Sequence, residues 1–166
     1  MKIGILSDTH IRQGKSLPPF IWDAFADIEM ILHAGDILIE SVLEELSLLA
    51  PVVAVKGNGD WLLSDLPDKI ITSAGKINVG ITHGYLGRGK NTPERAYNTF
   101  REDQVDLIIF GHSHVPFKSV HNGITLFNPG SPTDKRGQPY YSLGILTIED
   151  ESFDIQHLFY KTGGNL

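Results

Sequence analysis

The chain has 166 residues, no cysteine and a formal net charge of −6, with 41% hydrophobic and 20% charged residues. Without cysteine, disulfides, thiolate metal sites and cysteine nucleophiles are excluded, so a metal ion must be bound by imidazole, carboxylate or amide groups. The length fits one domain over residues 1–166, and the negative charge disfavours nucleic acid as the main partner. No stretch is apolar for long enough to form a signal-peptide core or cross a bilayer, which predicts a cytoplasmic protein without a membrane anchor.

Short apolar runs alternate with helical patterns in the first half of the chain. Strands are expected at residues 2–7, 30–33 and 52–55, and helices at 20–28 and 39–49. Pro18 and Pro19 open the first helix, where proline is well tolerated. This β-α-β-α-β order implies parallel strands joined by right-handed crossovers.

The second half is richer in strands. A hairpin is expected from residues 70–74 and 77–82, followed by a helix with Thr92 as N-cap and Pro93 in its first position, and by further strands at 106–110, 117–121, 124–128, 143–148 and 153–159. Two packed sheets with helices outside would accommodate this mixture of elements. Trp22 and Trp61 are expected to fill core or groove space.

Side chains able to bind metal follow five of the predicted strands. They are Asp8 and His10, Asp36, Asn58, His83, and His112 and His114. In open α/β sheets functional residues lie beyond the carboxyl ends of the strands. Residues two apart in extended chain point the same way, so each Asp-x-His or His-x-His pair is expected to face one site. Such a mixed nitrogen and oxygen set suits Mn, Fe, Zn or Ni better than Ca or Mg.

Each motif alone has an ordinary structural interpretation. Asp8-Thr9-His10 resembles a solvated turn, Gly35-Asp36 a helix start, Gly57–Asp60 a turn, and His83 a core histidine. Two histidines after an apolar strand, at His112 and His114, are less common. The occurrence of all five motifs at strand ends favours a metal centre.

The motifs Asp-x-His, Gly-Asp, Gly-Asn-x-Asp, Thr-His-Gly and Gly-His-x-His, in this order, resemble the signature of calcineurin-like metallophosphoesterases. The short length, His33-Ala34-Gly35-Asp36 and Asn128-Pro129-Gly130-Ser131 resemble the small bacterial and archaeal branch typified by YfcE and YsnB. The resemblance spans Lys2 to about Ile148. It implies a single metallophosphoesterase domain with an α/β fold, a four-layer αββα sandwich of two mixed β-sheets flanked by helices.

The resemblance also implies how the metals are bound. A first divalent transition-metal ion would be held by Asp8, His10, Asp36 and His114, and a second by Asp36 as the bridge with Asn58, His83 and His112. Manganese is expected, with Ni, Zn, Fe or Co as alternatives. A metal-bridging hydroxide would then hydrolyse a small phosphodiester, with Asp36, Asn58 and His83 at the catalytic centre.

Four further residues are expected near the ligands. His33 would donate to a ligand carboxylate or simply pack, and Asp60 would orient a ligand histidine. Asn128 would support the Gly-His-x-His loop. Arg88, in the glycine-rich segment 84–91, would contact substrate or lie on an ordinary surface loop. His121 and His157 are expected to be solvated and structural, respectively.

One position departs from the family pattern. In many relatives a histidine after the asparagine of Gly-Asn is thought to protonate the leaving group, whereas this chain has Gly59. The departure predicts a preference for aryl phosphodiesters over alkyl phosphomonoesters.

Two other functions remain open, a non-catalytic scaffold and a nuclease. A eukaryotic relative serves as a membrane-coat subunit with an eroded metal site, whereas here no ligand is missing; nucleases of the superfamily carry extra DNA-binding modules. A homodimer is expected because small members of the family often pair.

Overall fold

The structure, a computed structural model, describes residues 1–161, in which ten strands form two five-stranded sheets. The first sheet has the order β10 (Ser152–Tyr160), β9 (Tyr141–Glu149), β1 (Lys2–Leu6), β2 (Met30–His33) and β3 (Val52–Ala54). The second has the order β4 (Lys69–Ala74), β5 (Ile77–Thr82), β6 (Leu107–Ile109), β8 (Ile124–Asn128) and β7 (Phe117–His121). The second sheet is therefore formed by one continuous part of the chain, β4 to β8, whereas the first sheet combines the first three strands with the last two.

Both sheets mix parallel and antiparallel pairs. In the first, β1, β2 and β3 are parallel and are connected through α1 (Pro19–Ala24) and α2 (Glu40–Ser47), while β9 and β10 form an antiparallel extension. In the second, β5, β6 and β8 are parallel, and β4 and β7 pair antiparallel at the two edges. The predicted parallel β-α-β-α-β unit and the predicted hairpin are both confirmed.

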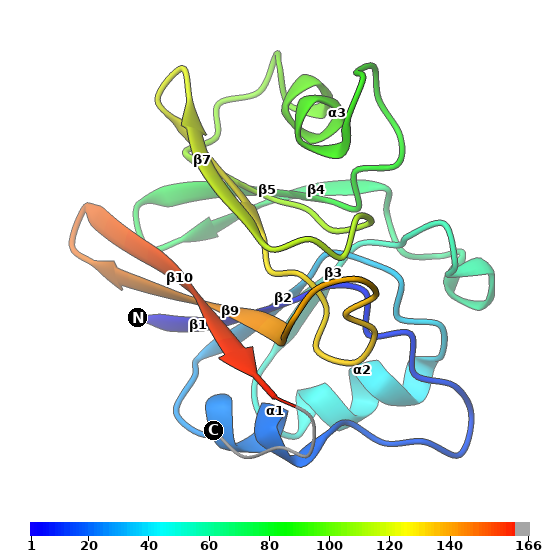
Figure 1. The fold of residues 1–166 in the computed structure, drawn as a ribbon. Helices are drawn as coiled ribbons and strands as arrows, with labels where there is room; N and C mark the ends of the chain where they lie inside the picture. The colour runs from blue at the N-terminus through cyan, green and yellow to red at the C-terminus, as the bar shows by residue number, and fades with distance from the viewer. Residues whose placement is uncertain (162–166) are drawn as a thin grey trace.

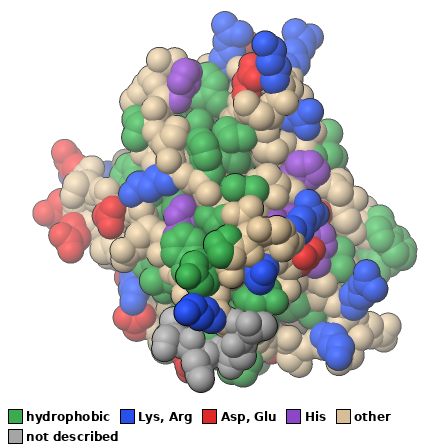
Figure 2. Space-filling model, in the orientation of Figure 1, with side chains coloured by type: hydrophobic (Ala, Val, Ile, Leu, Met, Phe, Trp, Pro, Cys, Tyr) green, Lys and Arg blue, Asp and Glu red, His purple; other side chains and the backbone are tan. Residues whose placement is uncertain are grey.

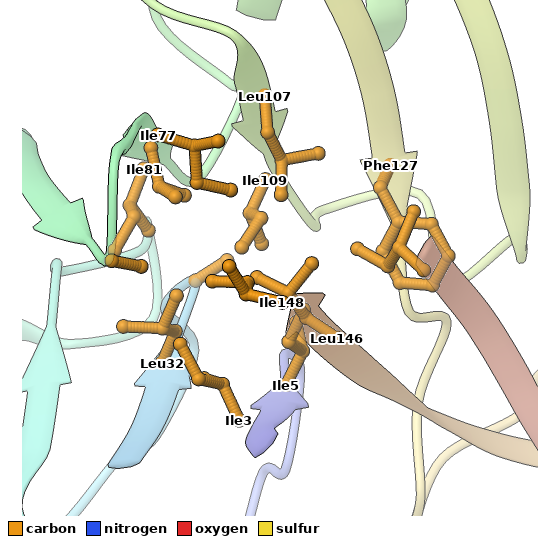
Figure 3. Close-up of a cluster of buried hydrophobic side chains, with 14 of the residues drawn as sticks. Ile3, Ile5, Leu32, Ile77, Ile81, Leu107, Ile109, Phe127, Leu146 and Ile148 are labelled. Carbon is orange, nitrogen blue, oxygen red and sulfur yellow. The ribbon is translucent and has the colours of Figure 1, made fainter. Parts of the chain in front are cut away.

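The sheets pack face to face, with helices on their outer faces (Figure 1). Isoleucine, leucine and valine side chains from both sheets form the central cluster, where Ile3, Ile5 and Leu32 meet Ile81 and Ile109 (Figure 3). A second buried cluster joins the first sheet to α1 and α2, and a third joins the second sheet to α3 (Thr92–Thr99). These three apolar layers confirm the four-layer αββα sandwich.

Local details differ from the prediction at three places. Helix α1 ends at Ala24, so Ile28 lies outside it although it is buried in the same cluster. The N-cap of α3 is Asn91, because its side-chain oxygen accepts the Glu94 N–H at 2.9 Å; Thr92 is already helical. Trp22 packs against the outer cluster, but Trp61 is 78% exposed, which contradicts its expected place in the core or a groove.

Trp61 is exposed because it begins the short 3-10 helix η1 (Trp61–Leu63). The preceding residue, Asp60, is buried and anchors this turn, which leaves the indole on the outside. None of the helices in residues 1–161 has the length and apolar character needed to span a membrane.

Candidate metal centre

The candidate ligands follow the carboxyl ends of β1, β2, β3, β5 and β6, as the sequence predicts. Their backbone is not extended, however. Left-handed φ angles occur at Asp8 (55°), His10 (44°), Asp36 (56°), His112 (68°) and His114 (59°). The expectation that extended spacing aims each pair at one site is therefore wrong in its geometry.

Tertiary hydrogen bonds explain why the chain accepts this conformation, which costs on the order of 1 kcal/mol for each non-glycine residue. The Asp8 N–H donates to the Gly35 carbonyl at 2.9 Å, and the His10 N–H to the Asp36 carbonyl at 3.0 Å. The loop after β1 is thus bonded along the loop after β2. Both turn sharply toward the same space instead of continuing as strands.

Two glycines allow the loops to approach so closely. A Cβ atom at Gly57 would collide with the Asp36 carboxylate, and one at Gly111 would collide with Ser7 and with the Asp8 carboxylate. Only glycine leaves room for these contacts. The Asp36 carboxylate consequently packs against the loop after β3, and the Asp8 carboxylate packs against the loop after β6.

The first group of candidate ligands contains Asp8, His10 and His114, whose ligand atoms lie within 4.8 Å of one another. His114 Nε2 is 3.3 Å from Asp8 Oδ1 and 3.1 Å from His10 Nε2. His10 Nε2 is also 3.3 Å from Asp36 Oδ2. Since His114 Nδ1 donates to the Asp134 carbonyl, its Nε2 directs a lone pair at this group.

The second group contains Asp8, Asp36 and His83. His83 Nδ1 donates to the Ala34 carbonyl at 2.8 Å, which fixes the neutral tautomer with the lone pair on Nε2. That Nε2 is buried without a hydrogen-bond partner, 3.5 Å from Asp36 Oδ1 and 3.9 Å from Asp8 Oδ1. A lone pair facing two carboxylates in the interior requires a cation, so the residues fit a bound metal ion.

Asn58 and His112 lie beside the second group. Asn58 Oδ1 is 2.9 Å from His112 Nδ1, and the His112 ring centroid is 5.2 Å from that of His83. Asn58 is exposed and His112 is half-buried, so this pair lies on the solvent side of the buried ligands. The structure therefore brings all the predicted ligand residues to one edge of the sandwich.

The electrostatics of the metal-free cluster are those of ion pairs. Burial disfavours the charged form of both Asp8 and Asp36, but the neighbouring imidazoles and the hydrogen bonds to the carboxylates together outweigh it and lower the pKa of each carboxyl below its ordinary value. Burial also opposes protonation of His83 and His114, yet the same contacts raise the pKa of each imidazole. The carboxylates therefore favour positive charge at the positions of the candidate ligand histidines.

Of the residues expected behind the ligands, His33 packs in the interior, which is one of its two expected alternatives, whereas Asp60 has a role other than the one predicted. His33 Nδ1 accepts the Gly35 N–H, and its Nε2 lies 3.1 Å from Thr9 Oγ1, so it contacts no ligand carboxylate. Burial lowers the pKa of His33 to about 4, which keeps it neutral. Asp60 accepts backbone N–H groups from the loops after β2 and β3 instead of orienting a histidine.

Asn128 has the predicted role, since its amide donates to the Gly111 carbonyl at 2.8 Å and to Ser113 Oγ at 3.1 Å. Arg88 is exposed, and within residues 1–161 no hydrogen bond or ion pair joins its side chain to the ligands. His121 is exposed as expected, and His157 packs against Phe127 with its Nε2 2.7 Å from the Asn128 carbonyl.

Sequence reasoning missed a supporting segment that follows β8. Ser131 Oγ donates to the Asp8 carbonyl at 2.7 Å, Thr133 Oγ1 donates to the Thr9 carbonyl, and the Asp134 carbonyl receives His114 Nδ1. Burial lowers the pKa of His112, and the charge of Arg136 acts in the same direction. The Asn-Pro-Gly-Ser turn was the only sequence signal that pointed to this region.

A family model for the calcineurin-like phosphoesterase superfamily domain matches residues 1–151. The chain belongs to the calcineurin-like phosphoesterase superfamily. Among curated relatives of this superfamily, a probable metallophosphoesterase of Methanocaldococcus jannaschii is 39% identical, over 91% of this chain and 78% of the relative. A probable metallophosphoesterase of Methanothermobacter thermautotrophicus is 38% identical, over 94% and 91% of the two chains.

Solved structures of calcineurin-like proteins share the fold. Vps29 of Entamoeba histolytica, solved in complex with zinc, superposes with a TM-score of 0.83 at 24% identity, over 98% of this chain and 94% of Vps29. An archaeal phosphodiesterase superposes with a TM-score of 0.72 at 25% identity, over 95% of this chain and 100% of that one.

Proposed function

We propose that this calcineurin-like protein is a phosphodiesterase that hydrolyses small phosphodiesters with two divalent transition-metal ions. The observation that supports it most directly is the buried, unpartnered Nε2 of His83 facing the carboxylates of Asp8 and Asp36. A packed core histidine would have a partner for this atom. Here the atom has the surroundings of a metal ligand.

The proposed ligand sets follow the grouping in space. Asp8, His10, Asp36 and His114 would hold the first ion, and Asp36 would bridge to a second ion held by Asn58, His83 and His112. Manganese is the favoured metal, because carboxylate, amide and imidazole ligands suit it; Ni, Zn, Fe and Co also fit this donor set. When bound, such ions lower the pKa of water and neutralise charge on phosphoryl oxygens.

The chain's own residues contribute orientation. The Ala34 and Asp134 carbonyls fix the tautomers of His83 and His114, so each presents Nε2 to the centre. The Tyr85 ring lies 5.7 Å from that of His83 and 6.3 Å from that of His112, between centroids, and covers one side of the site. Burial raises the pKa of the Tyr85 phenol, so it remains a neutral hydrogen-bond donor.

A preference for diesters with acidic leaving groups follows from Gly59, which offers no side chain to protonate a departing oxygen. Its backbone N–H is also engaged, since it donates to Asp36 Oδ1 at 2.7 Å. A phosphodiesterase of Methanocaldococcus jannaschii that is 29% identical over 92% of this chain supports the same reaction class. The physiological substrate would be a small molecule.

The test is a panel of aryl and alkyl phosphomonoesters and phosphodiesters assayed with chelated protein reloaded with Mn, Ni, Zn, Co or Mg. We expect chelation to abolish hydrolysis, Mn or Ni to restore it, and aryl diesters to be the best substrates. Metal content is measured on the same samples. Full activity after exhaustive chelation would refute metal dependence, and a preference for alkyl monoesters would refute the diester assignment.

The likeness to Vps29 makes a non-catalytic scaffold the second candidate. The complete ligand set favours the enzyme, and the same panel separates the two, because a scaffold would hydrolyse no ester with any metal. A nuclease is disfavoured by the net charge of −6. The protein is also proposed to form a homodimer, which light scattering at low concentration tests.

A further inference from the structure

A groove that carries two cationic side chains adjoins the ligand cluster on the His10 side. It has a volume of about 460 Å³, and its lining includes His10, Arg12, Gln13, Lys15, Ser16 and Thr133. Because His10 belongs to both, the groove borders the candidate metal centre. Its volume is within the range of sites that hold a small organic ligand, roughly 300–1,000 Å³.

The charge of this groove is opposite to that of the chain. Arg12 and Lys15 are its two cations, and no aspartate or glutamate is among its lining residues. Within residues 1–161, neither cation has a carboxylate oxygen within 4.0 Å, whereas five lysines elsewhere are paired and Lys90 and Lys135 are not. The paired lysines are Lys2, Lys56, Lys69, Lys76 and Lys118.

The acidic groups of the candidate centre and of the adjoining loop are already engaged. Asp8 and Asp36 contact the candidate histidine ligands, and Asp134 lies 3.6 Å from His114 Nδ1 and 3.9 Å from Arg136 Nε. Figure 2 shows several Lys and Arg side chains among His side chains on the right of the molecule, and a group of acidic side chains projecting at the left. In a chain of net charge −6, this leaves positive charge uncompensated beside the candidate centre.

The segment that carries the two cations is anchored at both ends. Ile11 and Leu17 are only 5% and 4% exposed and belong to the outer apolar cluster, and the Leu17 N–H donates to the Glu45 carboxylate at 3.1 Å. The Lys15 N–H donates to the Arg12 carbonyl at 3.0 Å, which closes a β-turn. Residues at the two ends of such a turn have Cα atoms less than about 7 Å apart, so both cations can reach one anion.

We propose that this groove binds a second phosphate group of the substrate, with Arg12 and Lys15 as its ligands. The substrate class is then a phosphodiester that carries a phosphate on one of its two arms. Paired cations of this kind bind phosphate through charge-assisted hydrogen bonds, and the guanidinium does so in a bidentate manner. The inference rests on the proposed function for the position of the scissile phosphate.

Binding tests the groove without any turnover. Calorimetry of the manganese-loaded protein compares thymidine 3′,5′-bisphosphate with thymidine 5′-monophosphate. We expect the bisphosphate to bind at least about tenfold more tightly, and Arg12→Ala/Lys15→Ala to abolish that advantage while monophosphate affinity stays within about twofold. The control Lys76→Ala/Arg101→Ala removes the same number of positive charges. Lys76 directly precedes β5, at the end of the strand opposite His83, and both side chains are exposed.

A matched pair of substrates tests the effect on catalysis. The p-nitrophenyl ester of thymidine 5′-phosphate is compared with the same ester carrying a 3′-phosphate, so the scissile bond and the leaving group are identical. We expect the 3′-phosphate to lower KM about tenfold in the wild type, and Arg12→Ala/Lys15→Ala to raise KM for that substrate only, with kcat unchanged.

The two measurements separate the two hypotheses. If no ester is hydrolysed but the bisphosphate retains its advantage, the proposed function fails and the groove stands. Three results would contradict the proposed phosphate site in the groove. They are equal affinity for the two nucleotides, an affinity advantage of the bisphosphate that survives in Arg12→Ala/Lys15→Ala, and an equal loss of that advantage in the Lys76→Ala/Arg101→Ala control.

Discussion

Asp60 Oδ2 lies 2.8 Å from the backbone nitrogen of Asp36, so the carboxylate of one aspartate fixes the position of another. The same oxygen accepts the Gly57 N–H at 2.7 Å, and Asp60 Oδ1 accepts the N–H groups of Ile37 and Leu38. One buried side chain therefore holds together the loop that carries Asp36 and the loop that carries Asn58. The hydrogen bonds to Asp60 also offset the energetic cost of the left-handed backbone conformation at Asp36.

The substitution Asp60→Asn should destabilise the protein and loosen the metal centre. An amide has one oxygen in place of two, so at least one buried N–H loses its acceptor and the others lose a charged one, at a combined cost of about 2–4 kcal/mol. Urea unfolding of the metal-free protein measures this. The exposed Asp65→Asn is the control and should change stability by less than about 0.5 kcal/mol; an equally small effect at Asp60 would contradict the role assigned to it.

Among the ligands, Asp36→Asn should be the most damaging single change, because it weakens both proposed metal sites. We expect kcat/KM to fall by more than about 100-fold, beyond the effect usual for residues that only support ligands. His114→Ala should mainly empty the first site, and His83→Ala the second. Elemental analysis of each variant decides the matter: a variant Asp36→Asn that keeps both ions and normal turnover would disprove the bridging role.

The absence of a side chain at Gly59 should appear in the dependence of rate on the leaving group. For a series of aryl and alkyl diesters we expect a steep negative slope of log kcat/KM against leaving-group pKa. Gly59→His should flatten it, since general acid assistance is worth roughly 100- to 10,000-fold. A Cβ at this position would lie 3.0 Å from the flexible tip of Leu38, and Gly59→Ala controls for that contact. If the wild-type slope is already flat, another donor is present, and Tyr85→Phe tests the phenol beside His83 and His112.

His157 should make stability sensitive to acid. Burial lowers its pKa, so the folded protein favours the neutral imidazole, whose Nε2–H donates to the Asn128 carbonyl. This stabilisation is complete above the unfolded-state pKa of about 6.5 and is lost as the pH falls toward the lower folded-state value. Between about pH 7.5 and about pH 5.5, the unfolding free energy of the wild type should fall further than that of His157→Gln. Equal losses in the two proteins would show that His157 contributes nothing.

The sequence was sufficient to predict which side chains come together. Parallel strands place their carboxyl ends at one edge of the sheet, so the polar residues after β1, β2 and β3 had to lie close together. The helices and strands were predicted because apolar periodicity reports burial directly. The errors at Thr92 and Trp61 concern the direction of one side chain at an element boundary, where periodicity carries no information.

The local geometry of the centre could not be predicted in the same way. Asp8 and His114 adopt left-handed conformations because of hydrogen bonds to residues far along the chain, such as that from Asp8 to Gly35. Asp60 was expected to orient a ligand histidine, although its contacts make it the anchor of two loops. Such partners are set by the packing of loops that follow different strands. A single sequence shows the polar residues but not which of them are hydrogen-bonded to each other.

The division of the ligands between the sheets has a mechanical consequence. Asp8, His10, Asp36 and Asn58 follow strands of one sheet, whereas His83, His112 and His114 follow strands of the other. An ion bound by residues from both would add a cross-link between two layers that are already joined by apolar packing, by chain connections and by hydrogen bonds such as that from His83 Nδ1 to the Ala34 carbonyl. In a protein without cysteine, the bound ion would stabilise this edge of the sandwich by linking its two layers, as a disulfide does in a secreted domain. Removal of the metal would then free the two layers to separate at this edge first, and amide hydrogen exchange would quicken there before it does at the opposite hairpins.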